Sequence, residues 1–167
     1  VAPSAHGFET PLGTTSLDRS CIDDLRQKGV VTHNDGAHAG EHCIEVQLPF
    51  LKVLYPDTPI VPLLVGHAGA LSVAKLIKLL WECDDTLILI SSDLSHFHGY
   101  SDAKRLDSRT SKAIVEKRYD ALHPDSACGR IPISGMLMVC RDENLDIIAL
   151  DLRNSGDTGG ELDRVVG

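Results

Sequence analysis

Apolar residues at helical spacing predict the first helix of the chain. Ile22 and Leu25 fall on one side of a helix over Asp18–Lys28, which begins at a favoured N-cap residue. Gly29 follows directly, and glycine commonly ends a helix. The same reasoning predicts four more helices, over residues 41–55 with a kink at Pro49, 71–81, 101–118 and 133–140.

Three short apolar runs predict buried strands, over residues 60–65, 86–90 and 146–152. The run Thr86–Ile90 is the strongest of them, because its apolar residues face both ways, as in a central strand that helices cover on both sides. Strands that alternate with helices predict a layered α/β fold. Exposure of alternate residues along Thr86–Ile90 would refute these layers.

The composition is that of an ordinary globular chain with an acidic surface. The 167 residues suit a single domain, 43% of them are hydrophobic, and the formal net charge is −8. This charge argues against nucleic acid as a partner, because phosphate binding needs a basic face, but it leaves room for a small ligand in a local positive pocket. The hydrophobic runs are short, so we expect no membrane span and no signal peptide.

The cysteines predict a reduced, cytoplasmic protein. Their number is odd, their spacing is irregular and no Cys-x-x-Cys pair occurs, which is unlike a disulfide framework. The five are Cys21, Cys43, Cys83, Cys128 and Cys140. Eight histidines, several of them in predicted loops, are the first indication of chemistry.

The first candidate segment spans residues 35–45. His38 and His42 are four residues apart, as are Glu41 and Glu45, so each pair would share one face of a helix. Histidine and glutamate at such spacing occur in metal sites of helix bundles. Helix capping is the alternative, because acidic residues favour a helix N-terminus.

The second segment follows the predicted central strand, at the place where open α/β sheets bind ligands. Asp93 and His96 are close enough to pair, and the pair would orient the imidazole and raise its basicity. Alternatively, Asp93 caps the end of the strand. His98 is interpreted as a surface histidine.

The third segment places Cys128 beside Gly129 and Arg130, just before an apolar helix. The guanidinium and the helix N-terminus both favour the thiolate, which is the form that binds metal or attacks a substrate. The alternative is a small buried thiol, the commonest fate of cysteine, and the other four cysteines are assigned to that class. A fourth segment, Leu152–Thr158, either contacts a ligand or forms a simple turn.

Five segments in the same order and spacing resemble the Memo family, known in bacteria and archaea as AmmeMemoRadiSam system protein B. They are Glu-His-Cys-Ile-Glu-Val-Gln-Leu-Pro-Phe-Leu from Glu41, Ser-Ser-Asp-Leu-Ser-His from Ser91, Cys-Gly-Arg from Cys128 with Pro132-Ile133 after it, Thr10–Gly13 and Leu152–Thr158. The agreement extends from about residue 8 to the C-terminus.

The resemblance implies the fold of the class III (LigB-like) extradiol dioxygenases, which use non-haem iron. That fold is a three-layer α/β/α sandwich with a mostly buried central sheet and a pocket at its edge. It also implies a metal site of two histidines and a cysteine, here Cys128, and a catalytic base at His96, with Asp93, His42 and Glu41 in the same pocket. Iron or copper is expected, with zinc as a further option. Substrate contacts are expected from Ser92, Arg130 and Asn154.

Two departures from the family pattern concern the metal histidines. The Pro-His-Ala-Gly segment that carries one of them is absent from the sequence. The other normally follows Pro-Ser, whereas here Pro3-Ser4 is followed by Ala5, and His6 is the nearest candidate. Val1 to Ser4 also reads as the end of a buried strand. We therefore expect one Memo-like domain over residues 1–167 that lacks its N-terminal portion and a loop near residues 4–6; otherwise the metal site is incomplete.

Three functions remain open at this point. The first is a metal-dependent oxidoreductase of unknown substrate that resembles the extradiol dioxygenases. The second is a non-catalytic adaptor that binds a peptide or metabolite in the same pocket. The third is an accessory component of a modification system with a radical-SAM partner, which rests on the family's bacterial name alone.

Overall fold

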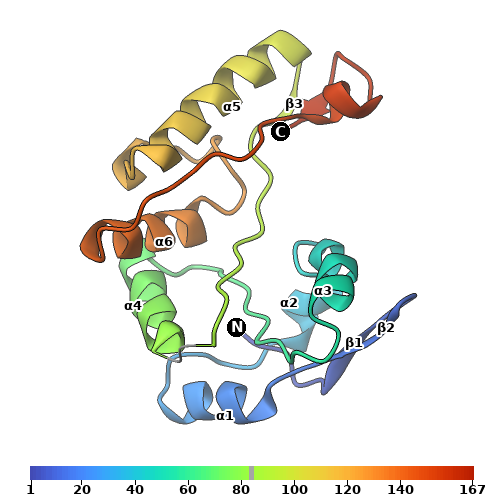
Figure 1. The fold of residues 1–167 in the computed structure, drawn as a ribbon, viewed down its shortest axis with the longest axis vertical. Coiled ribbons are helices and arrows are strands. Elements are labelled where there is room, and N and C mark those ends of the chain that lie inside the picture. The colour runs from blue at the N-terminus through green and yellow to red at the C-terminus, as the bar shows by residue number, and fades with distance from the viewer. Residues whose placement is uncertain (83–84) are drawn as a thin grey trace. The chain divides into compact units, whose positions relative to one another are not determined.

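The protein was analysed as a computed structural model that describes residues 1–82 and 85–167. The chain divides into two compact units, Val1–His67 and Ala68–Gly167 (Figure 1). The single domain that we expect over residues 1–167 therefore stays a prediction. Cys83, assigned above to the buried thiols, lies outside the described residues. Among the helices described, none combines the length and the apolarity that crossing a membrane requires.

The first unit begins with an antiparallel hairpin of β1 (Gly7–Thr10) and β2 (Gly13–Ser16). The Thr-Pro-Leu-Gly signal forms its turn, in which the Thr10 hydroxyl donates to the Gly13 carbonyl at 2.8 Å. Gly13 has a φ of 109°, a left-handed conformation that residues with a side chain rarely adopt. The turn was recognisable from the sequence, but the two strands beside it were not predicted.

Three helices complete the first unit: α1 (Arg19–Gln27), α2 (Asp35–Ala39) and α3 (Leu48–Leu54). The prediction for α1 is confirmed, including the cap, because the Asp18 carboxylate accepts the Cys21 N–H at 2.9 Å. The predicted helix over residues 41–55 is wrong in its first part. A 3-10 turn, η1 (Glu45–Gln47), precedes α3, and Pro49 lies in the first turn of α3, where its missing N–H costs nothing, and is not a kink.

Three longer helices build the second unit: α4 (Ala70–Trp81), α5 (Tyr100–Val115) and α6 (Arg130–Asp142). All three were predicted, with α6 three residues longer at its N-terminus. Helix α6 approaches α4 closely at Gly135, where a Cβ would lie only 2.8 Å from the Val73 side chain. A buried cluster of Ala113, Leu122 and Leu137 joins α5, α6 and the intervening 3-10 turn η2 (Tyr119–Ala121).

The predicted central strand at residues 86–90 is wrong. Those residues form no strand, and Leu87 and Leu89 are 67% and 53% exposed. Residues 146–152 are likewise extended without a ladder partner, with Ile148 and Leu150 at 78% and 92% exposure. A run that is apolar on both faces favours a buried strand. A strand also needs neighbouring strands that pair with its main-chain N–H and C=O groups. Within the described residues these segments have no such neighbours, so the three-layer sandwich is not confirmed.

The predicted strand at residues 60–65 is also largely wrong. Ile60 forms a single parallel bridge with Leu17, and Leu64 exchanges both main-chain hydrogen bonds with Val1. The rest of the run is irregular. The coarse prediction holds, since the protein mixes helices with short strands.

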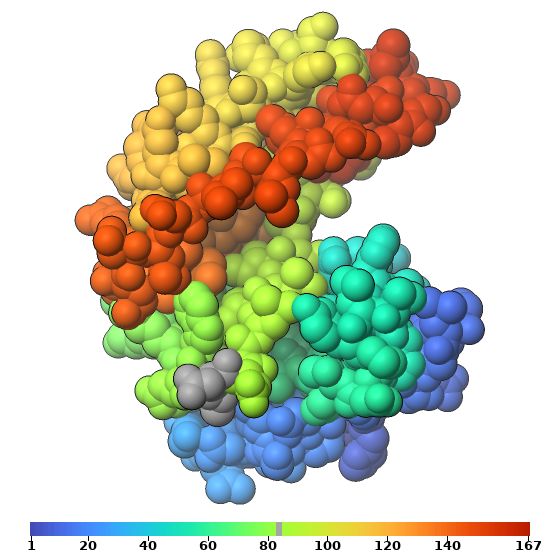
Figure 2. All heavy atoms as spheres, in the orientation of Figure 1, coloured from blue at the N-terminus to red at the C-terminus, as the bar shows by residue number. Residues whose placement is uncertain are grey.

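The one ladder of the second unit, within the described residues, pairs β3 (His96–His98) with β4 (Val165–Val166) in antiparallel fashion. The chain returns to β4 from α6 through the extended residues 146–152 and a 3-10 turn, η3 (Ser155–Thr158). Figure 2 shows this returning segment, orange to red, on the surface in front of α5. An open groove of about 480 Å³ lies between them, lined mainly by aliphatic side chains of α5 and of residues 147–152.

Candidate metal centre

The loop before β3 carries two of the predicted site residues, and main-chain hydrogen bonds hold it at several points. The Leu94 N–H donates to the Gly167 carbonyl at 2.8 Å, and the Gly167 N–H donates to the Ser95 carbonyl at 2.9 Å. The Cys128 N–H donates to the Asp93 carbonyl at 3.2 Å. The loop is thus fixed both to the end of β4 and to the loop that precedes α6.

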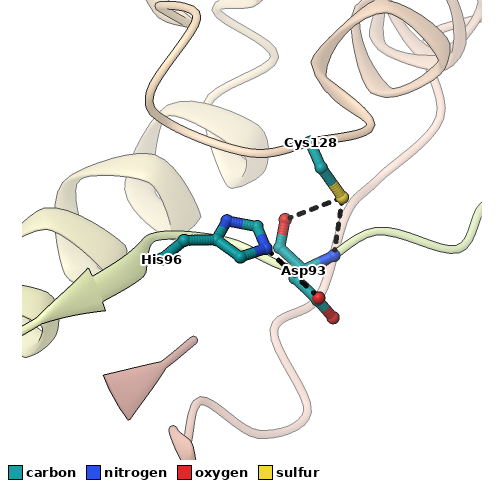
Figure 3. Close-up of side chains that lie close together, drawn as sticks. All are labelled: Asp93, His96 and Cys128. Carbon is teal, nitrogen blue, oxygen red and sulfur yellow. Dashed lines mark hydrogen bonds and ion pairs between the residues drawn. The ribbon is translucent and has the colours of Figure 1, made fainter. Parts of the chain in front are cut away.

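Asp93, His96 and Cys128 form a cluster in which one possible ligand atom from each lies within 4.8 Å of the others (Figure 3). The His96 Nε2 atom lies 3.4 Å from the Asp93 Oδ2 atom, as the i, i+3 spacing predicted. Both side chains are partly exposed, so solvent or a ligand can reach them. The predicted pair is confirmed as a contact, and Cys128 joins it from a segment 35 residues away.

Cys128 is held against the Asp93 loop by its own sulfur atom and by its neighbour. The Asp93 N–H donates to Sγ at 3.3 Å, and Sγ lies 3.5 Å from the Ser92 hydroxyl. The Gly129 N–H donates to the same hydroxyl at 2.9 Å. Sγ also lies 3.8 Å from the Asp93 carbonyl oxygen, to which a thiol can donate. Cys128 is exposed, so the alternative of a buried thiol does not describe it.

The three donors fit a transition metal by type, and two of them by distance. Thiolate and imidazole suit zinc, copper and iron, whereas calcium and magnesium prefer oxygen donors alone. Donors around a four-coordinate zinc ion lie roughly 3.5 Å apart, given bonds of roughly 2.0–2.3 Å. The Asp93–His96 separation of 3.4 Å meets this spacing, and the Cys128 Sγ atom lies within 4.8 Å of the other two donors. Three donors leave at least one position for another ligand.

Three other predicted site residues belong to the first unit. The Glu41 carboxylate accepts the N–H groups of Cys43 and His42 at 3.0 and 2.8 Å. These hydrogen bonds lower the pKa of Glu41, and the one from the Cys43 N–H contributes most. The carboxylate therefore closes a local turn ahead of η1, and it caps no helix, because the N-cap residue of η1 is Ile44. His42 and His6 are exposed. The convergence of Glu41 and His42 with the cluster, and the metal role of His6, stay predictions.

The three residues predicted to contact substrate have different positions and contacts in the structure. Ser92 lies in the cluster and donates to the Asp93 carbonyl at 2.7 Å. Arg130 is the first residue of α6, beside Cys128. Asn154 is buried and caps η3. Its side-chain oxygen accepts the Gly156 N–H, and the Asp157 carboxylate accepts the Asn154 N–H, which completes a capping box. Its segment thus forms a turn, and substrate contact by these three residues stays a prediction.

Two residues that shape the cluster were missed by sequence reasoning. A Cβ on Gly129 would lie 2.7 Å from the Ser92 Cβ, so only glycine allows the two loops to approach so closely. Phe97 has a φ of 60°, unusual for a bulky residue, at an irregularity of the ladder between His96 and His98. The position of Gly129 next to Cys128 was a usable signal. Nothing in the sequence marks Phe97.

The family model and the similar proteins that match this chain agree on one family. The family described as Memo-like protein matches residues 1–167. A MEMO1 family protein of Aeropyrum pernix is 35% identical over 173 residues, covering 96% of this chain and 62% of that protein. A MEMO1 family protein of Methanosarcina acetivorans is 34% identical over 180 residues, covering 100% of this chain and 67% of that protein. The chain thus spans about 62% of the length of the first of these relatives. No solved structure matches it significantly.

Proposed function

Since the chain belongs to the family of Memo-like proteins, we propose that its second unit binds one transition-metal ion through Cys128, His96 and Asp93. The observation that carries the proposal is the approach of these three donors to within 4.8 Å of one another. Two loops that are distant in sequence supply them, and main-chain hydrogen bonds join those loops. The donor set favours iron, copper or zinc.

The finer function that we propose is a metal-dependent oxidoreductase of unidentified substrate, resembling the extradiol dioxygenases. Bound iron or copper would supply one-electron chemistry with dioxygen. The residues of the chain would hold the ion, leave a coordination position open and provide a proton acceptor. The exposure of the cluster supports substrate access.

The His96 imidazole has two possible duties in this proposal, and one nitrogen atom cannot perform both. As a ligand, it would bind the ion while Asp93 orients it or binds beside it. As a general base, it would take a proton from the substrate, and Asp93 would stabilise the imidazolium. The 3.4 Å contact between Nε2 and the Asp93 carboxylate suits either duty. Only the first makes metal affinity depend on His96.

An adaptor without catalysis is the second candidate, and the groove between α5 and residues 147–152 favours it. Exposed aliphatic side chains along an extended segment suit an apolar peptide or metabolite. A role beside a radical-SAM partner is a further proposal that rests on the family resemblance alone.

Titration with cobalt(II) tests the metal-binding function, because a thiolate ligand gives a charge-transfer band in the near ultraviolet. We expect one cobalt ion per chain, and loss of affinity in His96→Ala and Asp93→Ala. His98→Ala is the matched control, since His98 is exposed in the same strand but lies outside the cluster. Absence of the band in the wild-type chain would remove the proposed metal site.

Azide added to the cobalt form separates the two candidate functions. An open position predicts a change in the visible absorption bands when azide binds. An unchanged spectrum would mean that the coordination is closed, which favours the adaptor. If His96→Ala keeps wild-type cobalt affinity, His96 is not a ligand and the general-base duty is favoured.

A further inference from the structure

A buried carboxylate lies beneath the candidate metal centre, on helix α5. Asp107 is only 2% exposed, the lowest exposure of any acidic residue in the described core. It falls on the buried face of a helix that is otherwise polar. That face consists of Ala103, Asp107, Thr110 and Ala113. A charged residue at such a position is rarely fully buried unless it has a specific partner.

The partner of Asp107 is the peptide group between two of the metal-centre residues. Its Oδ1 atom accepts the N–H of Ser95 at 2.9 Å, and Ser95 is itself 1% exposed. Ser95 immediately precedes His96 in the chain. A hydrogen bond from a buried N–H to a carboxylate is charge-assisted and therefore stronger than one to a carbonyl.

This hydrogen bond completes the anchoring of the loop. Asp93 is held by the Cys128 N–H, by the Cys128 sulfur and by the Ser92 hydroxyl, and Leu94 is held by the Gly167 carbonyl. Asp107 supplies the side-chain contact of Ser95. It fixes the N–H of Ser95, while the neighbouring carbonyl of the same residue is held by Gly167. The separation of Asp93 and His96 depends on the conformation of the residues between them.

Stability alone does not account for a carboxylate at this position. Among the described residues, the second carboxylate oxygen of Asp107 and the hydroxyl of Ser95 are buried without a hydrogen-bond partner. Burying a charged group with incomplete hydrogen bonding is unfavourable, and an apolar side chain of similar size is often tolerated or stabilising at such sites. The unfavourable burial is explained if the carboxylate holds the loop of residues 93–95 in place.

We propose that Asp107 is a positioning residue of the metal centre, which holds the Ser95 peptide group so that Asp93 and His96 face the same point. The inference rests on the proposed metal-binding function, because an effect of Asp107 on metal affinity requires that a metal binds. The hydrogen bond between Asp107 and Ser95 does not depend on a metal. Asp107 touches neither the ion nor a substrate, and it acts through Ser95.

The test compares three variants by cobalt(II) titration, thermal unfolding and amide hydrogen exchange. Asp107→Leu keeps the number and branching of the side-chain heavy atoms and removes the acceptor. Asp107→Asn keeps an acceptor oxygen. Thr110→Val is the matched control, because Thr110 is buried on the same face one turn later and its hydroxyl donates within its own helix, to the Leu106 carbonyl at 3.2 Å.

We expect Asp107→Leu to lower cobalt affinity by about 10- to 100-fold, the range typical of residues that orient metal ligands. Its melting temperature should change little, and Asp107→Asn should restore affinity to within about threefold of the wild type. Thr110→Val should bind cobalt normally. The Ser95 amide should exchange at least about tenfold faster in Asp107→Leu than in the wild type, because its acceptor is gone.

Wild-type cobalt affinity in a folded Asp107→Leu chain would overturn the proposal, as would an equal loss of affinity in Thr110→Val. If Asp107→Leu does not fold, Asp107→Ala takes its place with the same expectations. A wild-type chain that binds no cobalt overturns the metal-binding function instead. The anchoring role is then decided by the Ser95 amide alone, and unchanged exchange in the variant would end it.

Discussion

Helix α6 has a cysteine at each end, and the two cysteines have opposite surroundings. Cys128 lies just before the helix, exposed, with an N–H donor at its sulfur atom and two possible metal ligands beside it. Cys140 lies in the last turns and is 5% exposed. Burial raises the pKa of the Cys140 thiol. The residue type is the same, so exposure and neighbours make the difference between a candidate metal ligand and a thiol packed in the core.

The glycines of the same region repeat this contrast. Gly129 lets the loop before α6 approach Ser92, and that approach brings Cys128 to the Asp93 loop. Gly135 lets the body of α6 approach Val73 on α4. One close contact serves the candidate site and the other serves the packing of the unit. The beginning of α6 and its body can therefore be disturbed separately.

The largest expected effect is on metal affinity. Cys128→Ser should weaken cobalt(II) or zinc(II) binding by about 100-fold or more, because it removes the softest of three ligands. Cys140→Ser should leave the affinity unchanged. Competition with a chromophoric chelator measures both. Equal affinities in the two variants would show that the contrast between the ends of α6 has no chemical meaning.

Alkylation rates should separate the two thiols by about 10- to 100-fold near neutral pH in the metal-free protein. Cys128 is exposed, whereas Cys140 is both covered and, because of its raised pKa, less often a thiolate. Mass spectrometry of iodoacetamide-treated peptides gives the two rates. Added zinc should protect Cys128 alone, and protection of neither thiol would argue against the ligand role.

The glycine pair sharpens the comparison at the level of packing. Gly129→Ala should lower metal affinity by about tenfold, because its Cβ would push against Ser92 and move Cys128. Gly135→Ala should instead destabilise the unit by about 1–3 kcal/mol through overpacking against α4. Metal titration and urea unfolding of both variants measure the two effects. Equal changes of affinity and of stability in the two variants would contradict the prediction.

The smallest expected effect is a pH dependence of stability at Cys140. A thiol with a raised native pKa favours the folded state below the ordinary thiol pKa of about 8.5, and that contribution is lost as the pH rises through the native value. The wild type should therefore lose more stability than Cys140→Ala above about pH 8.5. Urea unfolding at pH 7 and pH 9.5 measures the difference, and parallel losses would contradict it.

Helices α1, α4, α5 and α6 were predictable because their information is local. The Asp18 cap, the apolar side of α1 and the apolar residues of α6 lie within a few turns of one another in the sequence. The strands at residues 86–90 and 146–152 were mispredicted for the converse reason. Their sequences suit a strand, but pairing depends on a partner elsewhere in the chain, and the described residues supply none.

The candidate site was partly predictable for similar reasons. The Asp93–His96 contact follows from spacing within one loop, and Cys128 was marked by its position before a helix. Asp107 was missed, because it lies on a helix whose residues are mostly polar. An acidic residue in phase with Ala103 and Ala113 was the available signal.

The hydrogen bonds between the Cys128 and Asp93 loops have a consequence for the order of folding. They join positions 35 residues apart, whereas the contacts within α4, α5 and α6 are local. Local contacts form early and distant ones late, because closing a long loop costs entropy before any contact repays it. A metal ion that needs both loops would then bind after the rate-limiting step, so it would slow the unfolding of the second unit and leave its folding rate unchanged.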